Sequence, residues 1–240
     1  MNMSRTSRTI LVTALIAVAA VHLILFLNLP HLLQGIAALT LVAFVPGLLL
    51  VESLVGQSKS PPSMWERLLY SVAAGYGVAI VGMLMLSYLP GPLHQWQTLV
   101  LFDIMFVILA AIVLFQSGRG AETTPDAASF EDAAIEWRTH RWLLAGIVLL
   151  FLIGAFFRFT NIGYSEYQGD EARAALRAAA IIQGYDDVLF IHKKGPTEIL
   201  LPTAVYSLTG HLTESTARLP FAIANLTALF AVFLLGWRFF

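Results

Sequence analysis

Apolar runs about as long as a lipid bilayer is thick constrain the fold of this chain more than any other sequence feature. A hydrocarbon core about 30 Å thick is crossed by a helix of about 20 mainly apolar residues. Charged residues make up only 12% of the chain, against roughly 25% in ordinary soluble domains. The pattern predicts spans at residues 10–27, 32–55, 68–89, 98–116, 142–159 and 219–237, and a shorter one at 199–209 that Pro202 interrupts. We therefore expect an all-α polytopic membrane protein with about seven transmembrane helices.

The first run also resembles a secretory signal peptide, because Arg5 and Arg8 precede it. It is long for the apolar region of a signal peptide, and residues 28–31 offer no small-residue cleavage site. We therefore interpret residues 10–27 as an uncleaved transmembrane helix.

Net charge and cysteine content exclude several classes of function. The formal net charge of -1 leaves no basic surplus of the kind that binds nucleic acid. The chain contains no cysteine, which excludes disulfides, thiol nucleophiles and cysteine-ligated metals. The sequence has no nucleotide-binding motif, and His192 has no second histidine at metal-ligand spacing. We expect neither a metal nor a cofactor.

The distribution of lysine and arginine predicts the orientation, because positively charged loops near helix ends stay in the cytoplasm. With seven spans, the polar stretch of residues 160–198 then lies outside the cytoplasm. One miscounted short helix would reverse the side of this stretch. The residues that the orientation assigns to the cytoplasm are Arg5, Arg8, Lys59, Arg67, Arg119, Arg138 and Arg141.

Changes in composition divide the chain into two membrane modules. Residues 1–116 form a four-helix N-terminal module, residues 117–141 have the composition of a solvated cytoplasmic linker, and residues 142–240 begin a second module. Glu52 and Asp103 are the acidic residues within or beside the first four spans. Carboxylates inside a membrane are functional candidates. Because both lie near helix ends, we interpret them instead as side chains that reach water at the headgroup level.

The polar stretch contains the pattern of a short amphipathic helix. Gly169, Asp170 and Glu171 supply an acidic start, and Gly184 stands where a C-terminal cap is expected. At about 14 residues the helix is too short to cross a membrane, so we expect it to lie in the membrane interface. The apolar face that its spacing predicts consists of Ala172, Ala175, Leu176, Ala179 and Ile182, and the arginines expected near lipid phosphates are Arg173 and Arg177.

Such a helix holds Asp170 at a fixed height beside the membrane. A carboxylate in that position suits general-base chemistry on a headgroup carried by a lipid. The alternative is that Asp170 only caps the helix, as aspartate often does. Further along, Lys193 and Lys194 suit the binding of a carrier phosphate, and ordinary anchoring to anionic lipid is the alternative.

Residues 142–240 carry an ordered set of short motifs. In chain order they are Arg158, Gly169-Asp170-Glu171-Ala172, Lys194-Gly195-Pro196, Gly210, Glu214 and Arg218-Leu219-Pro220. The set resembles the N-terminal part of the GT-C membrane glycosyltransferases, in the superfamily of protein O-mannosyltransferases and lipid A aminoarabinose transferases. The resemblance implies inverting transfer of a sugar from a polyprenyl-phosphate-linked donor to a protein, lipid or glycan acceptor outside the cytoplasm.

The resemblance also implies roles for individual residues. Asp170 and Glu171 match the catalytic Asp-Glu pair of the family. Lys194 matches a lysine near the carrier phosphate, although Gly195 replaces a proline of the family motif. Arg218 is interpreted as structural, at the cytoplasmic start of the last span. The candidates for binding the carrier phosphate are Lys194, Lys193, Arg173 and Arg177.

Members of that family usually continue through more membrane helices. We therefore expect this chain to be the N-terminal part of such an enzyme, in the bacterial cell membrane. Two alternatives from other classes stay open. One is a catalytically silent membrane subunit that binds only the carrier lipid. The other, motivated by Glu52 and Asp103, is a small transporter or flippase component.

Overall fold

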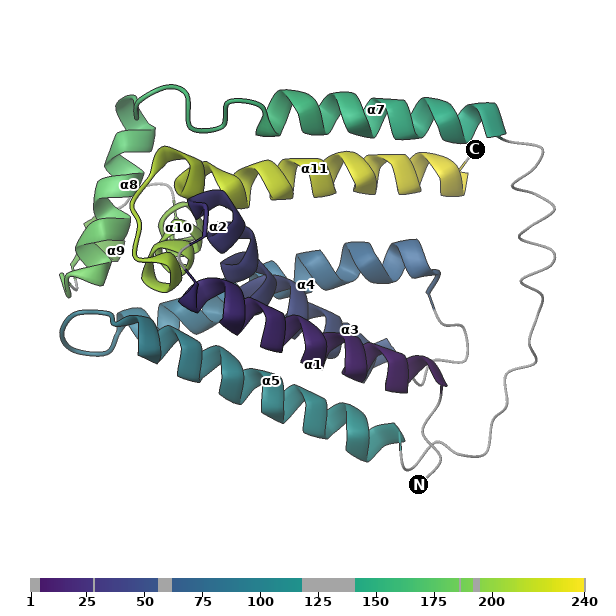
Figure 1. Cartoon of the computed structure of the whole chain (residues 1–240), viewed down its shortest axis with the longest axis horizontal. Helices are drawn as coiled ribbons and strands as arrows, with labels where there is room; N and C mark the ends of the chain where they lie inside the picture. Colours follow the sequence, from purple (N-terminus) through teal and green to yellow (C-terminus); the bar gives the residue numbers. More distant parts are fainter. Residues whose placement is uncertain are drawn as a thin grey trace.

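A computed structural model describes residues 5–27, 29–55, 62–117, 141–185, 187–191 and 195–239, and within these ranges every regular element is a helix. Long helices run between two ends of the molecule (Figure 1). We call the end that holds α8, α9 and α10 the α8 end, and the end where α1 begins and α11 finishes the terminal end. The elements are α1 (Arg5–Phe26), α2 (His31–Leu39), the π-helix η1 (Thr40–Phe44), α3 (Val45–Val55), α4 (Met64–Ser87), α5 (Gln95–Ser117), α7 (Arg141–Phe159), α8 (Gly169–Ile182), α9 (Val188–Ile191), α10 (Thr197–Thr209) and α11 (Glu214–Phe239).

The length and composition of the helices confirm the membrane character of the chain. Those long and apolar enough to cross a membrane are Ser7–Phe26, His31–Val55, Met64–Ser87, Gln95–Gln116 and Glu214–Trp237. Five of the predicted spans are therefore found, and the chain is an integral membrane protein. The helix α7 also runs from the terminal end to the α8 end (Figure 1), but its described apolar part, Ala145–Phe159, is shorter than the other five.

The stretch predicted as the sixth span is a short helix inside the protein. At 1.5 Å per residue, the 13 residues of α10 extend over roughly 20 Å, which is too short for the hydrocarbon core. Every residue from Ile199 to Thr209 is buried, and α10 packs against α2, α4, α5, α8 and α11. The prediction of a span at residues 199–209 is therefore wrong. Protein side chains, rather than lipid, surround this apolar segment.

The second span contains one wider helical turn, the π-helix η1, just before a proline. Pro46 has no N–H to donate to the preceding turn, and the π-helix η1 lies directly before it. Both η1 and α3 approach α4 closely, at two glycines. A Cβ atom on Gly47 would lie 1.9 Å from the carbonyl oxygen of Ser71, and one on Gly75 would lie 2.0 Å from that of Ala43. Only residues without side chains permit this contact.

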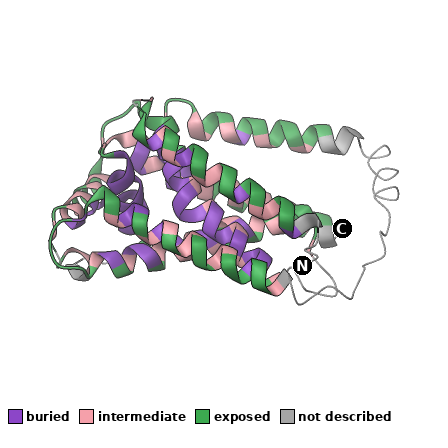
Figure 2. Ribbon diagram, turned by 60° about the horizontal axis from the view of Figure 1, so that its bottom comes forward, coloured by how far each residue is buried: buried purple, intermediate pink, exposed green. Residues whose placement is uncertain are grey.

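The two ends of the sequence share one core, which lies toward the α8 end (Figure 2). Met83 and Phe102 from the first four spans pack in the same cluster as Ile199 and Leu208 from α10. Polar contacts cross the same boundary, including a 3.0 Å hydrogen bond from the Thr98 hydroxyl to that of Ser207 and a 2.7 Å bond from the Gln95 amide to the carbonyl of Leu208. The N-terminal helices therefore support the elements of the α8 end directly.

Candidate functional site

The first turn of α8 presents Asp170 to the surface. The N-cap position is Gln168, with an extended backbone, and Gly169 takes a positive φ of 50° as the helix begins. Asp170 is thus inside the first turn, and the alternative that it is the capping residue is wrong. Its carboxylate is 60% exposed and lies 3.4 Å from the guanidinium of Arg173, which is 73% exposed. An exposed ion pair of this kind is weak and leaves the carboxylate accessible.

One face of α8 packs against protein. Its buried residues are Ala174, Ala178 and Ile181, and the helix packs mainly on α10. Leu176, which the spacing predicted on an apolar face lying in lipid, is 70% exposed in the protein. The helix is therefore found at the predicted residues, and the face that packs on α10 is a second one, made mainly of small residues that the predicted lipid face did not include.

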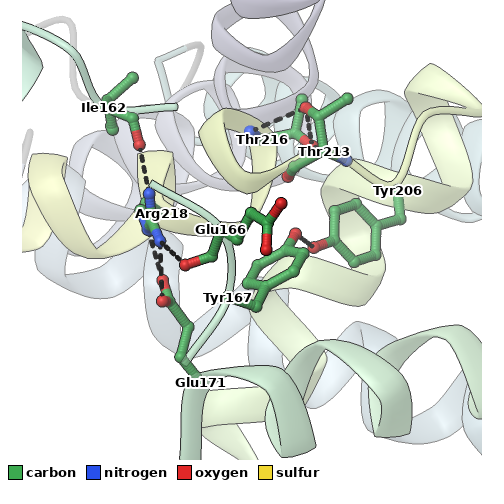
Figure 3. Close-up of polar contacts among 8 residues, drawn as sticks. All are labelled: Ile162, Glu166, Tyr167, Glu171, Tyr206, Thr213, Thr216 and Arg218. Carbon is green, nitrogen blue, oxygen red and sulfur yellow. Dashed lines mark hydrogen bonds and ion pairs between the residues drawn. The ribbon is translucent and has the colours of Figure 1, made fainter. Parts of the chain in front are cut away.

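The neighbouring carboxylate, Glu171, forms the strongest polar contact at this end. Its two oxygens accept hydrogen bonds from Nε and Nη2 of Arg218, at 2.5 and 2.8 Å (Figure 3). Arg218 also donates to the backbone carbonyls of Ile162, at 2.9 Å, and Glu166, at 3.4 Å. The first turn of α8, the preceding loop and the start of α11 are therefore held by one guanidinium.

This contact has two consequences. The hydrogen bonds from Arg218 hold the pKa of Glu171 below its usual value. The lowered pKa favours the ionised form of Glu171 and makes its carboxylate a weaker base than an unpaired glutamate. The contact also overturns the prediction for Arg218. That prediction placed Arg218 at the opposite side of the membrane from Asp170 and Glu171. The prediction was wrong because it counted α10 as a transmembrane span. Since α10 does not cross the membrane, α11 begins at the same end of the molecule as α8.

A tyrosine pair lies beside the guanidinium. The hydroxyls of Tyr167 and Tyr206 are 2.8 Å apart, and Arg218 stands 6.0 Å from the centre of the Tyr167 ring (Figure 3). Burial raises the pKa of Tyr167. Sequence reasoning missed both tyrosines, because no local spacing relates residues 39 positions apart.

Two cavities flank this cluster, and Phe221 contributes to both. The smaller, of about 240 Å³, lies between α8, α10 and α11 and is lined by Glu171, Ala174, Ala175, Glu198, Pro202, Ala217 and Phe221. We call it the Glu171 cavity. The larger, of about 410 Å³, is a shallow depression that is open to the surface, and it is lined by Phe157, Arg158, Thr160, Asn161, Ile162, Ser165, Arg218, Phe221, Ala222 and Asn225. We call it the Arg158 cavity.

Some of the residues that the sequence suggested for phosphate or metal binding lie outside this cluster or outside the described residues. Lys193 and Lys194, predicted to bind a carrier phosphate, lie outside the described residues, as does His192. Arg177 is half-buried on α8. Among the described ranges, no group of three or more histidine, aspartate or glutamate side chains could hold a metal ion.

The two carboxylates of the first spans have specific partners. Glu52 is 6% exposed, accepts a 2.7 Å hydrogen bond from Ser7 and pairs with Arg67 at 3.0 Å. Asp103 lies 3.1 Å from Nε2 of His22, whose Nδ1 is 2.9 Å from the carbonyl of Val18. Both carboxylates thus join helices in the fold, whereas the sequence suggested side chains that only reach water.

Comparison with known proteins gives no relatives. No protein-family model matches the chain, and neither a curated protein nor a solved structure matches it. The functional interpretation therefore rests on the geometry of the α8 end.

Proposed function

We propose that this chain is a membrane glycosyltransferase that takes its sugar from a polyprenyl-phosphate-linked donor. The observation that carries the proposal is the ion pair between Glu171 and Arg218. It holds the first turn of α8 against α11. An accessible carboxylate, Asp170, stands next to this fixed point, and a cavity lies on either side of Arg218 and Phe221. A rigid support beside a reactive group is what precise transfer requires.

In the proposed reaction, Asp170 acts as base or positioning carboxylate. It accepts the proton of an acceptor hydroxyl while the hydroxyl oxygen forms a bond to the anomeric carbon of the donor. The bond from that carbon to the phosphate oxygen breaks, and the carrier phosphate leaves with the electron pair, which inverts the anomeric centre. Glu171 is unsuited to take the proton, because Arg218 keeps its pKa low.

The charge of the loops between the first long helices supports an α8 end outside the cytoplasm, whereas Arg173, Arg177, Lys193 and Lys194, between α7 and α10, run against the same rule. Chain segments that join helices at the terminal end contain basic residues, including Lys59 between α3 and α4 and Arg119 and Arg138 between α5 and α7. The connections between α1 and α2 and between α4 and α5, at the α8 end, contain none. Basic loops stay in the cytoplasm. The proposed site would then face the outer surface of the bacterial cell membrane.

Transfer of a radiolabelled sugar from polyprenyl phosphate to endogenous acceptors tests the proposal, in membrane vesicles that contain the chain. We expect Asp170→Asn to lower the transfer rate by about 10²-fold or more, the usual contribution of a general base. Asp187→Asn is the matched control, because Asp187 is another exposed aspartate at the same end. Transfer at the wild-type rate in Asp170→Asn would remove the site. Donor binding without any transfer would favour the silent carrier-binding subunit.

A second candidate function, a transporter component, is favoured by one observation. The carboxylate of Asp103 lies about 12 Å along α5 from its first residue and bonds to His22 of α1. Its second oxygen, Oδ1, is buried and has no hydrogen-bond partner among the described residues. Paired ionisable groups inside membrane helices are common in proton pathways. Solute uptake driven by a pH gradient and lost in Asp103→Asn would support this function over transfer.

A further inference from the structure

The Arg158 cavity contains a cation without a counter-charge. Arg158 stands in the last turn of α7 and is half-buried. Its Nη1 atom donates a 3.2 Å hydrogen bond to the carbonyl of Gly154, one turn earlier in the same helix. Within the described residues it forms no salt bridge. An arginine that lines a cavity and has only a backbone partner retains several N–H groups for an anion.

The other groups around the cavity are suited to the same ligand. Arg218 adds a second guanidinium, which is ion-paired with Glu171 and also lies within electrostatic range of Glu214. Thr160, Asn161 and Ser165 supply neutral hydrogen-bonding groups from the loop after α7. Arginine together with hydroxyl and amide donors is the usual surrounding of a phosphate group. None of the described residues that line this cavity is a carboxylate.

The cavity is also partly apolar and extends along a membrane helix. Phe157, Phe221 and Ala222 line it together with the polar groups, and Phe157 is 77% exposed. Asn225 lies about 16 Å along α11 from Glu214, at a depth where a membrane helix is normally apolar. The cavity therefore joins a polar loop to the apolar surface of α7 and α11. Free phosphate needs only the polar part, whereas a lipid uses both.

We propose that the Arg158 cavity binds the phosphate group of a membrane lipid, with the lipid chain lying along α7 and α11. Arg158 is the principal phosphate-binding residue, and Arg218 and the loop donors complete the site. Binding is independent of any reaction at Asp170. Only the identity of the lipid as the polyprenyl carrier rests on the proposed transfer.

The test measures binding of geranylgeranyl phosphate to the full chain in detergent micelles, by microscale thermophoresis. Geranylgeraniol, which lacks the phosphate, and inorganic phosphate, which lacks the chain, are the two comparison probes. We expect geranylgeranyl phosphate to bind at least tenfold more tightly than either. In Arg158→Gln the dissociation constant should rise about tenfold, as expected for a lost charge-assisted hydrogen bond. Arg158→Lys should recover part of that loss.

Arg8→Gln is the matched control, because it removes the same charge from an exposed arginine at the terminal end. Asp170→Asn separates the two proposals, since it should bind geranylgeranyl phosphate normally even where transfer is lost. Thermal unfolding of each variant checks that Arg158→Gln is folded. Equal binding by wild type and folded Arg158→Gln would overturn the site. Equal binding of geranylgeraniol would overturn the role of the phosphate, and equal binding of inorganic phosphate would overturn the role of the lipid chain.

Discussion

Two glutamate–arginine pairs stand at opposite ends of this molecule, and they differ in how completely the fold encloses them. Toward the terminal end, Glu52 is 4% exposed at its side chain and binds both Arg67 and Ser7. At the α8 end, Glu171 is 36% exposed and its partner Arg218 also holds two loop carbonyls. The first pair is closed in by α1, α3 and α4. The second borders two cavities.

This difference separates an ion pair that only joins helices from one that also shapes a site. Glu52 has its charge fully compensated within the protein, so it has no remaining capacity for a ligand. Arg218 is compensated by Glu171, yet its neighbours Asp170 and Arg158 remain accessible. The enclosed Glu52–Arg67 pair has the rigidity expected of a scaffold. The Glu171–Arg218 pair has accessible polar groups beside it, as expected of a binding site.

The largest effect on stability is expected at the Glu52–Arg67 pair, which the fold encloses. Glu52→Ala leaves the Arg67 guanidinium largely buried and unpaired, which should lower the free energy of unfolding by about 3–5 kcal/mol. Unfolding in mixed micelles with increasing sodium dodecyl sulfate measures this change. Ser7→Ala removes only the neutral hydrogen bond and should cost about 1 kcal/mol. If the two variants are equally stable, leaving the Arg67 guanidinium without its carboxylate partner does not destabilise the protein.

The close contact of η1 with α4 should be nearly as sensitive. In Gly75→Ala the added Cβ atom meets the backbone oxygen of Ala43, so the helices must separate, at a cost of about 3 kcal/mol. Gly146→Ala in α7 is the matched control. Nothing lies within 4 Å of its added Cβ atom, and the better helix propensity of alanine should stabilise it by up to about 1 kcal/mol. The same unfolding assay compares them, and equal stabilities would contradict the contact.

A smaller effect on stability is expected at the open pair. Glu171→Gln weakens the contact with Arg218, which is partly solvated, so the free energy of unfolding should fall by about 1 kcal/mol. The loop of residues 160–168 should loosen at the same time, because Arg218 then loses the ionised carboxylate that is hydrogen-bonded to it and orients it. Limited proteolysis in this loop measures the loosening. Unchanged cleavage would show that backbone contacts alone hold the loop.

The smallest effect is the pH dependence of the open pair. Because the pKa of Glu171 is lowered in the folded protein, the pair stabilises fully above the unfolded pKa, near 4.3, and loses its contribution as the pH falls through the lower folded value. The difference in melting temperature between wild type and Glu171→Gln should therefore be constant from pH 7 to about pH 5 and shrink below about pH 4. A difference in melting temperature that stays constant down to pH 3 would contradict this role of the Glu171 carboxylate.

Much of the membrane fold was predictable from local pattern. The spans at residues 10–27, 32–55 and 219–237 were found within a few residues of the predicted bounds, because a run of about 20 apolar side chains has few other stable states. The helix at residues 169–182 was also found, before a glycine with positive φ at residue 184. Of the candidate site, the sequence singled out Asp170 as a base and Glu171 beside it, but it did not reveal the contact between Glu171 and Arg218.

The sequence by itself determined that the chain is helical, that it enters a membrane and that an acidic turn opens a short helix between spans, because these follow from side-chain hydrophobicity and helix period. Only the tertiary structure decided that α10 is buried in protein and that Arg218 meets Glu171. Hydropathy measures transfer out of water and is the same for lipid and for a protein interior. The partner of the Glu171 carboxylate, 47 residues away in the chain, depends on how the helices pack.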